Sequence, residues 1–216
     1  MAAVPMISME TIISQLGPQA LHELEQVEFD GPALLAVRDS TAPDRNNVLR
    51  QWLLSYNVFQ GIDNPGRDAI VAAILQWADR RDPERDLTTV EAITEAHVEL
   101  MGVCIEAYTG TSGKRRDFTS LASKALWLCY PASVPLYDSF TQCALWVLCK
   151  FLDTDPLPRA EPQYRQFVHI WKALYQRYEN TLDEIPLGNY PYRVRIFDII
   201  LWLVGKPRYD WEHQVG

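Results

Sequence analysis

A lysine and an aspartate near the middle of the chain carry the strongest chemical signal in the sequence. Lys124 stands among the apolar residues of the stretch FTSLASKALWLCYPASVPLYDSF (118–140), and Asp138 follows the prolines of the same stretch. Apolar surroundings disfavour the charged form of a lysine, which favours an amine nucleophile. A carboxylate beside such an amine can stabilise a developing cation or transfer a proton. Lys124 and Asp138 are therefore the candidate catalytic residues.

Each of the two residues also has a purely structural interpretation. Asp138 stands at the start of a predicted helix, where a carboxylate caps free backbone amides and contributes about 1 kcal/mol. Lys124 can lay its aliphatic stem along a half-buried helix and hold its ammonium in water. A capping carboxylate can still take part in catalysis, because the cap fixes its orientation. The sequence leaves both interpretations open.

The apolar residues recur at intervals of three and four, and the prolines fall mostly between the periodic segments. This spacing predicts an all-α fold. The helices are expected over residues 6–16, 18–28, 44–58, 66–81, 88–109, 118–130, 138–152, 162–181 and 191–204, and the loops over 29–43, 110–117, 153–162 and 182–190. Asp44, Asn64-Pro65 and Thr88-Thr89 provide the capping and first-turn signals of three of these helices.

Composition indicates a compact globular protein. The chain has 216 residues, of which 48% are hydrophobic and 22% charged, enough to bury a core without disulfides or metal. We expect one compact multi-helix domain over 1–216, with lobes over 1–110 and 111–216 as a candidate division. Most of the tryptophans fall at helical spacing from aliphatic residues, which indicates core packing.

Charge, cysteine spacing and hydropathy narrow the function classes. The net charge of −8 argues against a broadly basic nucleic-acid coat but not against a local basic groove. The four cysteines form no CxxC pair, so we interpret them as buried free thiols. The scattered histidines indicate no metal site, and no cofactor is implied. The absence of a signal peptide or membrane-length apolar run predicts a cytoplasmic protein without a membrane partner.

Two short motifs resemble those of the helix–hairpin–helix DNA glycosylases. The run Phe118-Thr119-Ser120-Leu121-Ala122-Ser123-Lys124 is similar to the family pattern Leu-Pro-Gly-Val-Gly-x-Lys, which leads into the helix that bears the catalytic lysine. Downstream, Val134-Pro135-Leu136-Tyr137-Asp138 is similar to the family's Val-Pro-Val-Asp, with one extra residue. Ser120 and Ala122 replace the two hairpin glycines, and the iron–sulfur cysteines common in the family are absent.

The resemblance implies a two-lobed helical fold and base-excision chemistry on DNA. Lys124 would attack the sugar C1′ of a flipped-out, damaged or modified nucleotide, and Asp138 would assist departure of the base. Ser120 and Ala122 would lie at the phosphate-binding hairpin. A basic cluster just before them would contact the backbone of the strand, through Lys114, Arg115 and Arg116.

Two function classes follow from the sequence. The first is a DNA glycosylase with lyase activity, acting through the Lys124–Asp138 pair, with DNA as its partner. The second is a catalytically silent helical module that binds or regulates a protein partner, for example in a bacterial defence or stress system. The two classes differ in what they require of Lys124, which must reach a substrate in the first class and need not do so in the second.

Overall fold

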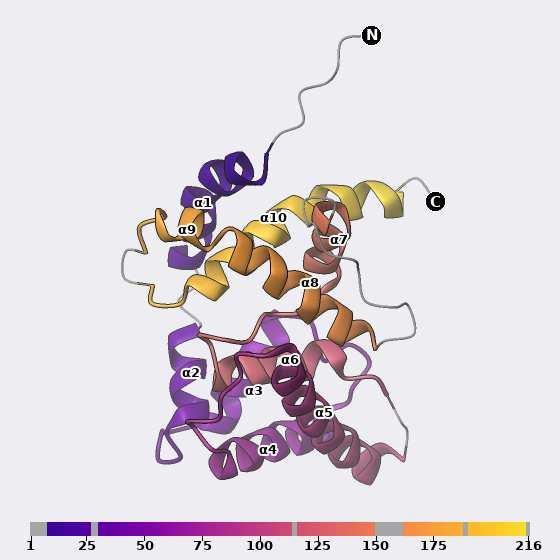
Figure 1. The fold of residues 1–216 in the computed structure, drawn as a ribbon. Coiled ribbons are helices and arrows are strands. Elements are labelled where there is room, and N and C mark those ends of the chain that lie inside the picture. The colour runs from indigo at the N-terminus through magenta and orange to yellow at the C-terminus, as the bar shows by residue number, and fades with distance from the viewer. Residues whose placement is uncertain (1–7, 27–29, 114–115, 150–161, 188–189, 215–216) are drawn as a thin grey trace. The chain divides into compact units, whose positions relative to one another are not determined.

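The computed structural model describes residues 8–26, 30–113, 116–149, 162–187 and 190–214, and of residues 25–26 and 208–214 it describes the backbone alone. Throughout these ranges the regular structure is helical, which confirms the all-α class (Figure 1). The helices are α1 (Met9–Gln26), α2 (Asp30–Arg38), α3 (Arg45–Ser55), α4 (Asn64–Arg80), α5 (Val90–Ser112), α6 (Thr119–Cys129), α7 (Ser139–Leu148), α8 (Gln163–Arg177), α9 (Glu179–Asp183) and α10 (Arg193–Gln214).

The chain divides into two compact units. The first unit combines Met1–Gln26 with Asp138–Gly216, and the second is Val27–Tyr137. In the first unit α10 packs against α7 and α1, and in the second α4 packs against α5, which also contacts α6. These contacts place α1 with the C-terminal helices and α6 with α5. The division therefore differs from the expected lobes 1–110 and 111–216.

Two predicted interruptions of helix are wrong. The loop expected over 29–43 contains α2, because Pro32 lies in the first helical turn, where a missing amide hydrogen costs nothing. The break expected before Pro18 is absent, and α1 runs through that proline. The buried side chains on both sides of Pro18 explain this continuity, since burial of one helix face outweighs one lost hydrogen bond; they are Met9, Ile13, Ala20 and Leu24.

The helix ends also depart from the predictions in places. Thr89 caps α5 as expected and accepts a hydrogen bond from the Ala92 amide at 3.1 Å. Asp44 makes no such cap, because its backbone is left-handed, with φ of 54°. The α4 cap is Asp63, one residue before the expected signal. At the C-terminus α10 continues past 204 to Gln214, whereas most of the loop expected over 153–162 lies outside the described residues.

Each unit has a buried tryptophan bonded to a buried carboxylate. Trp52 Nε1 donates to Asp30 Oδ1 at 2.9 Å in the second unit, and Trp171 Nε1 donates to Asp198 Oδ1 at 2.8 Å in the first. All four side chains are at most 2% exposed. Core packing is confirmed for these two tryptophans, whereas Trp146 is 51% exposed and is an exception to it.

The cysteines are free, and two of the four match the expected burial. Cys104 and Cys129 are buried, and burial raises the pKa of each thiol to about 12. Cys143 and Cys149 are partly exposed, which corrects the prediction for these two. Within the described ranges, no helix combines the length and the apolar character needed to cross a membrane.

Candidate functional site

The Lys124 side chain is buried on α6 and is only 2% exposed. Its Nζ donates a hydrogen bond to Ser120 Oγ at 2.9 Å and another to the Tyr137 carbonyl oxygen at 2.8 Å. Nζ also lies 5.5 Å from the centroid of the Tyr56 ring of the same unit, within the range of a cation–π contact. The expectation of a water-exposed ammonium is therefore wrong, because the group is turned inward to protein acceptors.

Two serines of α6 form hydrogen bonds with the backbone of Tyr137, which Lys124 also contacts. Ser120 Oγ donates to the Tyr137 carbonyl at 3.2 Å, and Ser123 Oγ accepts from the Tyr137 amide at 3.2 Å. Ser123 Oγ also donates to the Ser120 carbonyl at 2.9 Å. The backbone of Tyr137 is thus held to one face of α6 by three polar side chains. The spacing 120, 123, 124 places them on that face.

Asp138 caps α7, as its structural interpretation predicts. Its Oδ1 accepts a hydrogen bond from the Thr141 amide at 2.8 Å, and Thr141 Oγ1 accepts one from the Asp138 amide at 3.1 Å. This reciprocal arrangement is a capping box, which satisfies two amides that lack helical partners. In the chain Asp138 directly follows Tyr137, but it belongs to the first unit, whereas Lys124 belongs to the second. Its catalytic role stays a prediction.

The predicted phosphate-binding residues are not assembled as an open hairpin. Ala122 is fully buried, and its amide donates to the Phe118 carbonyl at 2.8 Å within the helix. The hydroxyl of Ser120 is occupied by the contacts described above. Arg116 Nη1 donates to the Gln60 carbonyl. Lys114 and Arg115 lie outside the described residues.

His97 connects α5 to the first turn of α6. The carbonyl of Thr119 can only accept, so His97 Nε2 carries the hydrogen that it donates at 3.0 Å. Burial lowers the pKa of His97 to about 4, although the hydrogen bond to Thr119 and the charge of Asp117 oppose this shift. His97 is therefore neutral at physiological pH and acts as a fixed hydrogen-bond donor. Its place within an otherwise apolar helix face is the sequence signal for this role.

The lowered pKa of His97 predicts a stability that depends on pH. Between pH 6.5 and about 4 the unfolded chain binds a proton that the folded protein excludes. The contribution to the free energy of unfolding is complete above pH 6.5 and falls as the pH drops, by up to roughly 3 kcal/mol. His97→Gln keeps a donor but removes the titration. Urea unfolding at pH 7 and 5 should therefore show a smaller loss for His97→Gln than for the wild type.

A matched control is available in His22→Gln, because His22 is exposed. This variant should lose as much stability on acidification as the wild type. Equal acid sensitivity of all three proteins would contradict a buried neutral His97.

Among the described residues, no group of three or more histidine, cysteine or acidic side chains is placed to hold a metal ion. Comparisons of the chain with protein-family models, with curated proteins and with solved structures found no match. What the described residues define is a class, a protein of two helical units. The roles of Lys124 and Asp138 therefore rest on their own geometry.

Proposed function

We propose that the chain is a non-catalytic helical module that binds or regulates a partner, and that Lys124 and Asp138 stabilise it. The observation that carries this proposal is the pair of hydrogen bonds from Lys124 Nζ to Ser120 Oγ and the Tyr137 carbonyl, made by a side chain that is 2% exposed. Such an arrangement joins a helix to the segment that follows it.

A nucleophilic lysine requires a different arrangement from this buried, hydrogen-bonded one. Its nitrogen must approach the substrate carbon with a free lone pair. Here Nζ lies between two oxygen acceptors and the face of Tyr56. The burial of the side chain leaves no route for a sugar carbon in this arrangement. The inward bonds favour a structural anchor over a reactive amine.

The Asp138 carboxylate fits the same proposal. Its Oδ1 accepts from the Thr141 amide and is 3.2 Å from Thr141 Oγ1. These contacts complete the first turn of α7 and hold the chain where it leaves Tyr137. Lys124 on α6 would thus hold Tyr137, and the Asp138 carboxylate would hold the first turn of α7 through Thr141.

The glycosylase is the second candidate, and one observation favours it. Lys124 Nζ lies 2.8 Å from the carbonyl of the residue that directly precedes Asp138. An amine close to the VPLYD run is what the resemblance to helix–hairpin–helix glycosylases implies. On this candidate Lys124 is the nucleophile, Asp138 supports the departing base, and damaged DNA is the substrate.

Lys124→Ala separates the two candidates by stability and by covalent trapping. For a structural lysine we expect a loss of about 2–3 kcal/mol, because the Tyr137 carbonyl loses a hydrogen-bond donor and a void remains. We also expect no borohydride-trapped adduct of the wild type with abasic or modified DNA. Urea unfolding and gel analysis of the trapping reactions measure the two effects.

Lys206→Ala is the control, because Lys206 is exposed and lies over the Trp202 ring at 4.5 Å. It should change the free energy of unfolding by less than about 1 kcal/mol. A wild-type adduct that disappears in Lys124→Ala, with stability unchanged, would overturn the module in favour of the glycosylase.

A further inference from the structure

A hollow of about 360 Å³ lies entirely within the second unit. Its α4 wall comprises Ala73, Gln76, Trp77 and Arg80, which recur at three and four and so share one helix face. Its remaining lining is Arg81, Asp82, Arg85, Glu99, Val103 and Tyr130. We call this hollow the arginine pocket. It contains neither Lys124 nor Asp138.

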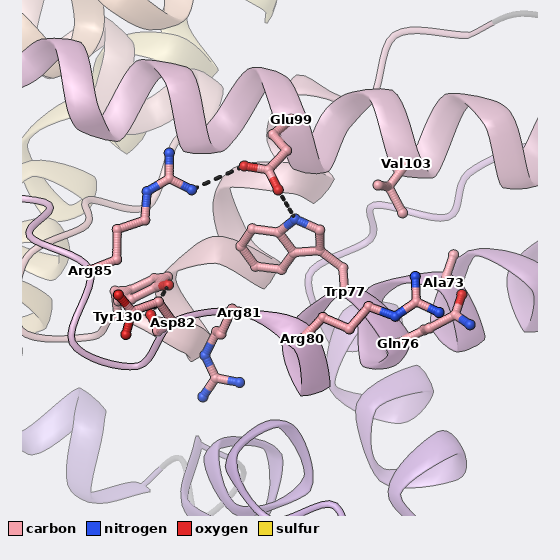
Figure 2. A pocket seen from close by; sticks show the side chains of 10 residues that line it. All are labelled: Ala73, Gln76, Trp77, Arg80, Arg81, Asp82, Arg85, Glu99, Val103 and Tyr130. Atoms are coloured by element: carbon pink, nitrogen blue, oxygen red, sulfur yellow. Dashed lines mark hydrogen bonds and ion pairs between the residues drawn. The ribbon is translucent and has the colours of Figure 1, made fainter.

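On one side of the arginine pocket, hydrogen bonds fix the side chains of Trp77, Glu99 and Arg85. Trp77 Nε1 donates to Glu99 Oε1 at 2.7 Å, and Arg85 Nη1 donates to Glu99 Oε2 at 3.0 Å (Figure 2). Burial alone would raise the pKa of Glu99, but these two hydrogen bonds and the charge of Arg85 lower it. Glu99 is therefore ionised, and the charge of Arg85 balances it.

Tyr130 and Arg81 hold the turn that closes this side of the pocket. The Tyr130 hydroxyl donates to the Asp82 carbonyl at 2.7 Å. Arg81 Nη1 donates to the carbonyls of Val37 and Ala78, so its guanidinium serves the C-terminal ends of two helices. The guanidinium of Arg81 stays a positive charge at the edge of the pocket, since carbonyls do not neutralise it.

Arg80 is the positively charged residue of the lining whose guanidinium can bind an anionic ligand. It is exposed at the last position of α4, and no described side chain pairs with its guanidinium. Figure 2 shows its side chain beside Ala73 and Gln76, on the other side of Trp77 from Arg85. The lining carries the positive charges of Arg80, Arg81 and Arg85 against the negative charges of Asp82 and Glu99, so it has a positive excess in a chain of net charge −8.

We propose that the arginine pocket binds a small organic anion, with one carboxylate or phosphate group on Arg80 and a flat apolar body beside Trp77. A guanidinium offers parallel N–H donors that match the two oxygens of either group. Trp77, Ala73 and Val103 supply the apolar wall, and Gln76 supplies a neutral polar group one turn before Arg80. The volume suits a ligand of one ring, at the small end of ligand sites.

This proposal names a ligand for the binding module and in that respect rests on the proposed function. The proposed function and the anion site can be disproved separately. The test of the function measures adduct formation at Lys124, whereas the test of the anion site measures reversible binding at Arg80. An adduct would overturn the silent module and leave the anion site standing. Loss of anion binding would leave the role of Lys124 unchanged.

The test is titration of the full chain with phenyl phosphate, benzoate and inorganic phosphate, followed by the Trp77 indole N–H resonance and by calorimetry. Either aromatic anion should shift the Trp77 resonance. Comparison of the affinities of phenyl phosphate and benzoate shows whether the pocket prefers a phosphate or a carboxylate group. Arg80→Gln should weaken binding about tenfold, since a charged hydrogen bond is lost. Arg177→Gln is the matched control, because Arg177 is also exposed at the last position of its helix, α8.

The expected result is binding that Arg80→Gln weakens and Arg177→Gln preserves. Absence of any shift at millimolar concentrations of all three compounds would overturn the proposal. So would equal affinities of Arg80→Gln and the wild type. Inorganic phosphate binding as tightly as phenyl phosphate would overturn the part of the proposal that concerns the flat apolar body.

Discussion

Trp52→Ala is expected to destabilise the second unit by about 4 kcal/mol. Trp52 is 1% exposed, and its indole stacks on Trp127 with centroids 6.0 Å apart and planes inclined by 7°. It also contacts the Tyr56 ring at 4.5 Å. Alanine removes these contacts and leaves a large void. The buried Asp30 carboxylate also loses the indole N–H that it accepts at 2.9 Å.

Trp146→Ala is the control for this change, because Trp146 is 51% exposed. It should cost less than about 1 kcal/mol. Trp52→Phe is an intermediate change, since it keeps an aromatic ring but removes the donor to Asp30 and the part of the indole that a phenyl ring does not fill. We expect it to fall between the two alanine variants. Urea unfolding followed by circular dichroism measures all three, and amide exchange in α2, α3 and α6 locates the loss. A cost for Trp52→Ala no greater than for Trp146→Ala would contradict this account of the core.

The same aromatic cluster bears on the candidate site. The Tyr56 ring contacts Trp52, and Lys124 Nζ lies over the same ring. Loss of Trp52 would therefore weaken the packing of Tyr56, which lies next to Lys124, without changing Lys124 itself. If Lys124 is a structural anchor, Trp52→Ala and Lys124→Ala should destabilise the same unit, and their effects should not be additive, because the two residues share a neighbour.

The helix periodicity was sufficient to predict most elements of this fold but not the partners of the helices. The predicted helices lie close to α4, α5 and α6, since α4 and α5 each bury one face and α6 is buried at every position from Leu121 to Cys129. It misses α2, where Gly31 and Pro32 are typical of a loop. Local turn signals cannot report burial, and the buried Ala33, Leu34 and Val37 decide the helix here.

The sequence also predicts only part of the candidate site. The sequence singles out Lys124 and Asp138 by residue type, and it predicts the cap at Asp138 from its place before a helix. It does not predict that Lys124 turns toward Tyr137, because that bond joins α6 to a segment thirteen residues along the chain. It also gives no sign of the arginine pocket, whose charged residues belong to α4, a turn and α5. Only the packing of those elements brings them together.

Gly205→Ala is expected to disrupt the packing of α10 on α7, at a cost of at least about 3 kcal/mol. A Cβ at Gly205 would lie 1.9 Å from the Phe140 carbonyl oxygen and 2.7 Å from the Phe140 carbonyl carbon. Both are backbone atoms, so no side-chain rotation relieves the overlap, and the two helices must separate. The separation would also break the edge-to-face contact of Phe140 with Trp202, whose centroids are 5.8 Å apart.

Gly102→Ala is the matched control, because Gly102 lies inside α5 and a Cβ there meets nothing within 4 Å. It should stabilise the protein by about 0.5–1 kcal/mol, since alanine restricts the unfolded chain more than glycine does. Urea unfolding measures both variants, and amide exchange should show protection lost in α7 and α10 for Gly205→Ala but kept in α4 and α5. If Gly205→Ala instead matched Gly102→Ala, the close crossing of α10 and α7 would be wrong. The glycine at this position of α10 would then need another explanation.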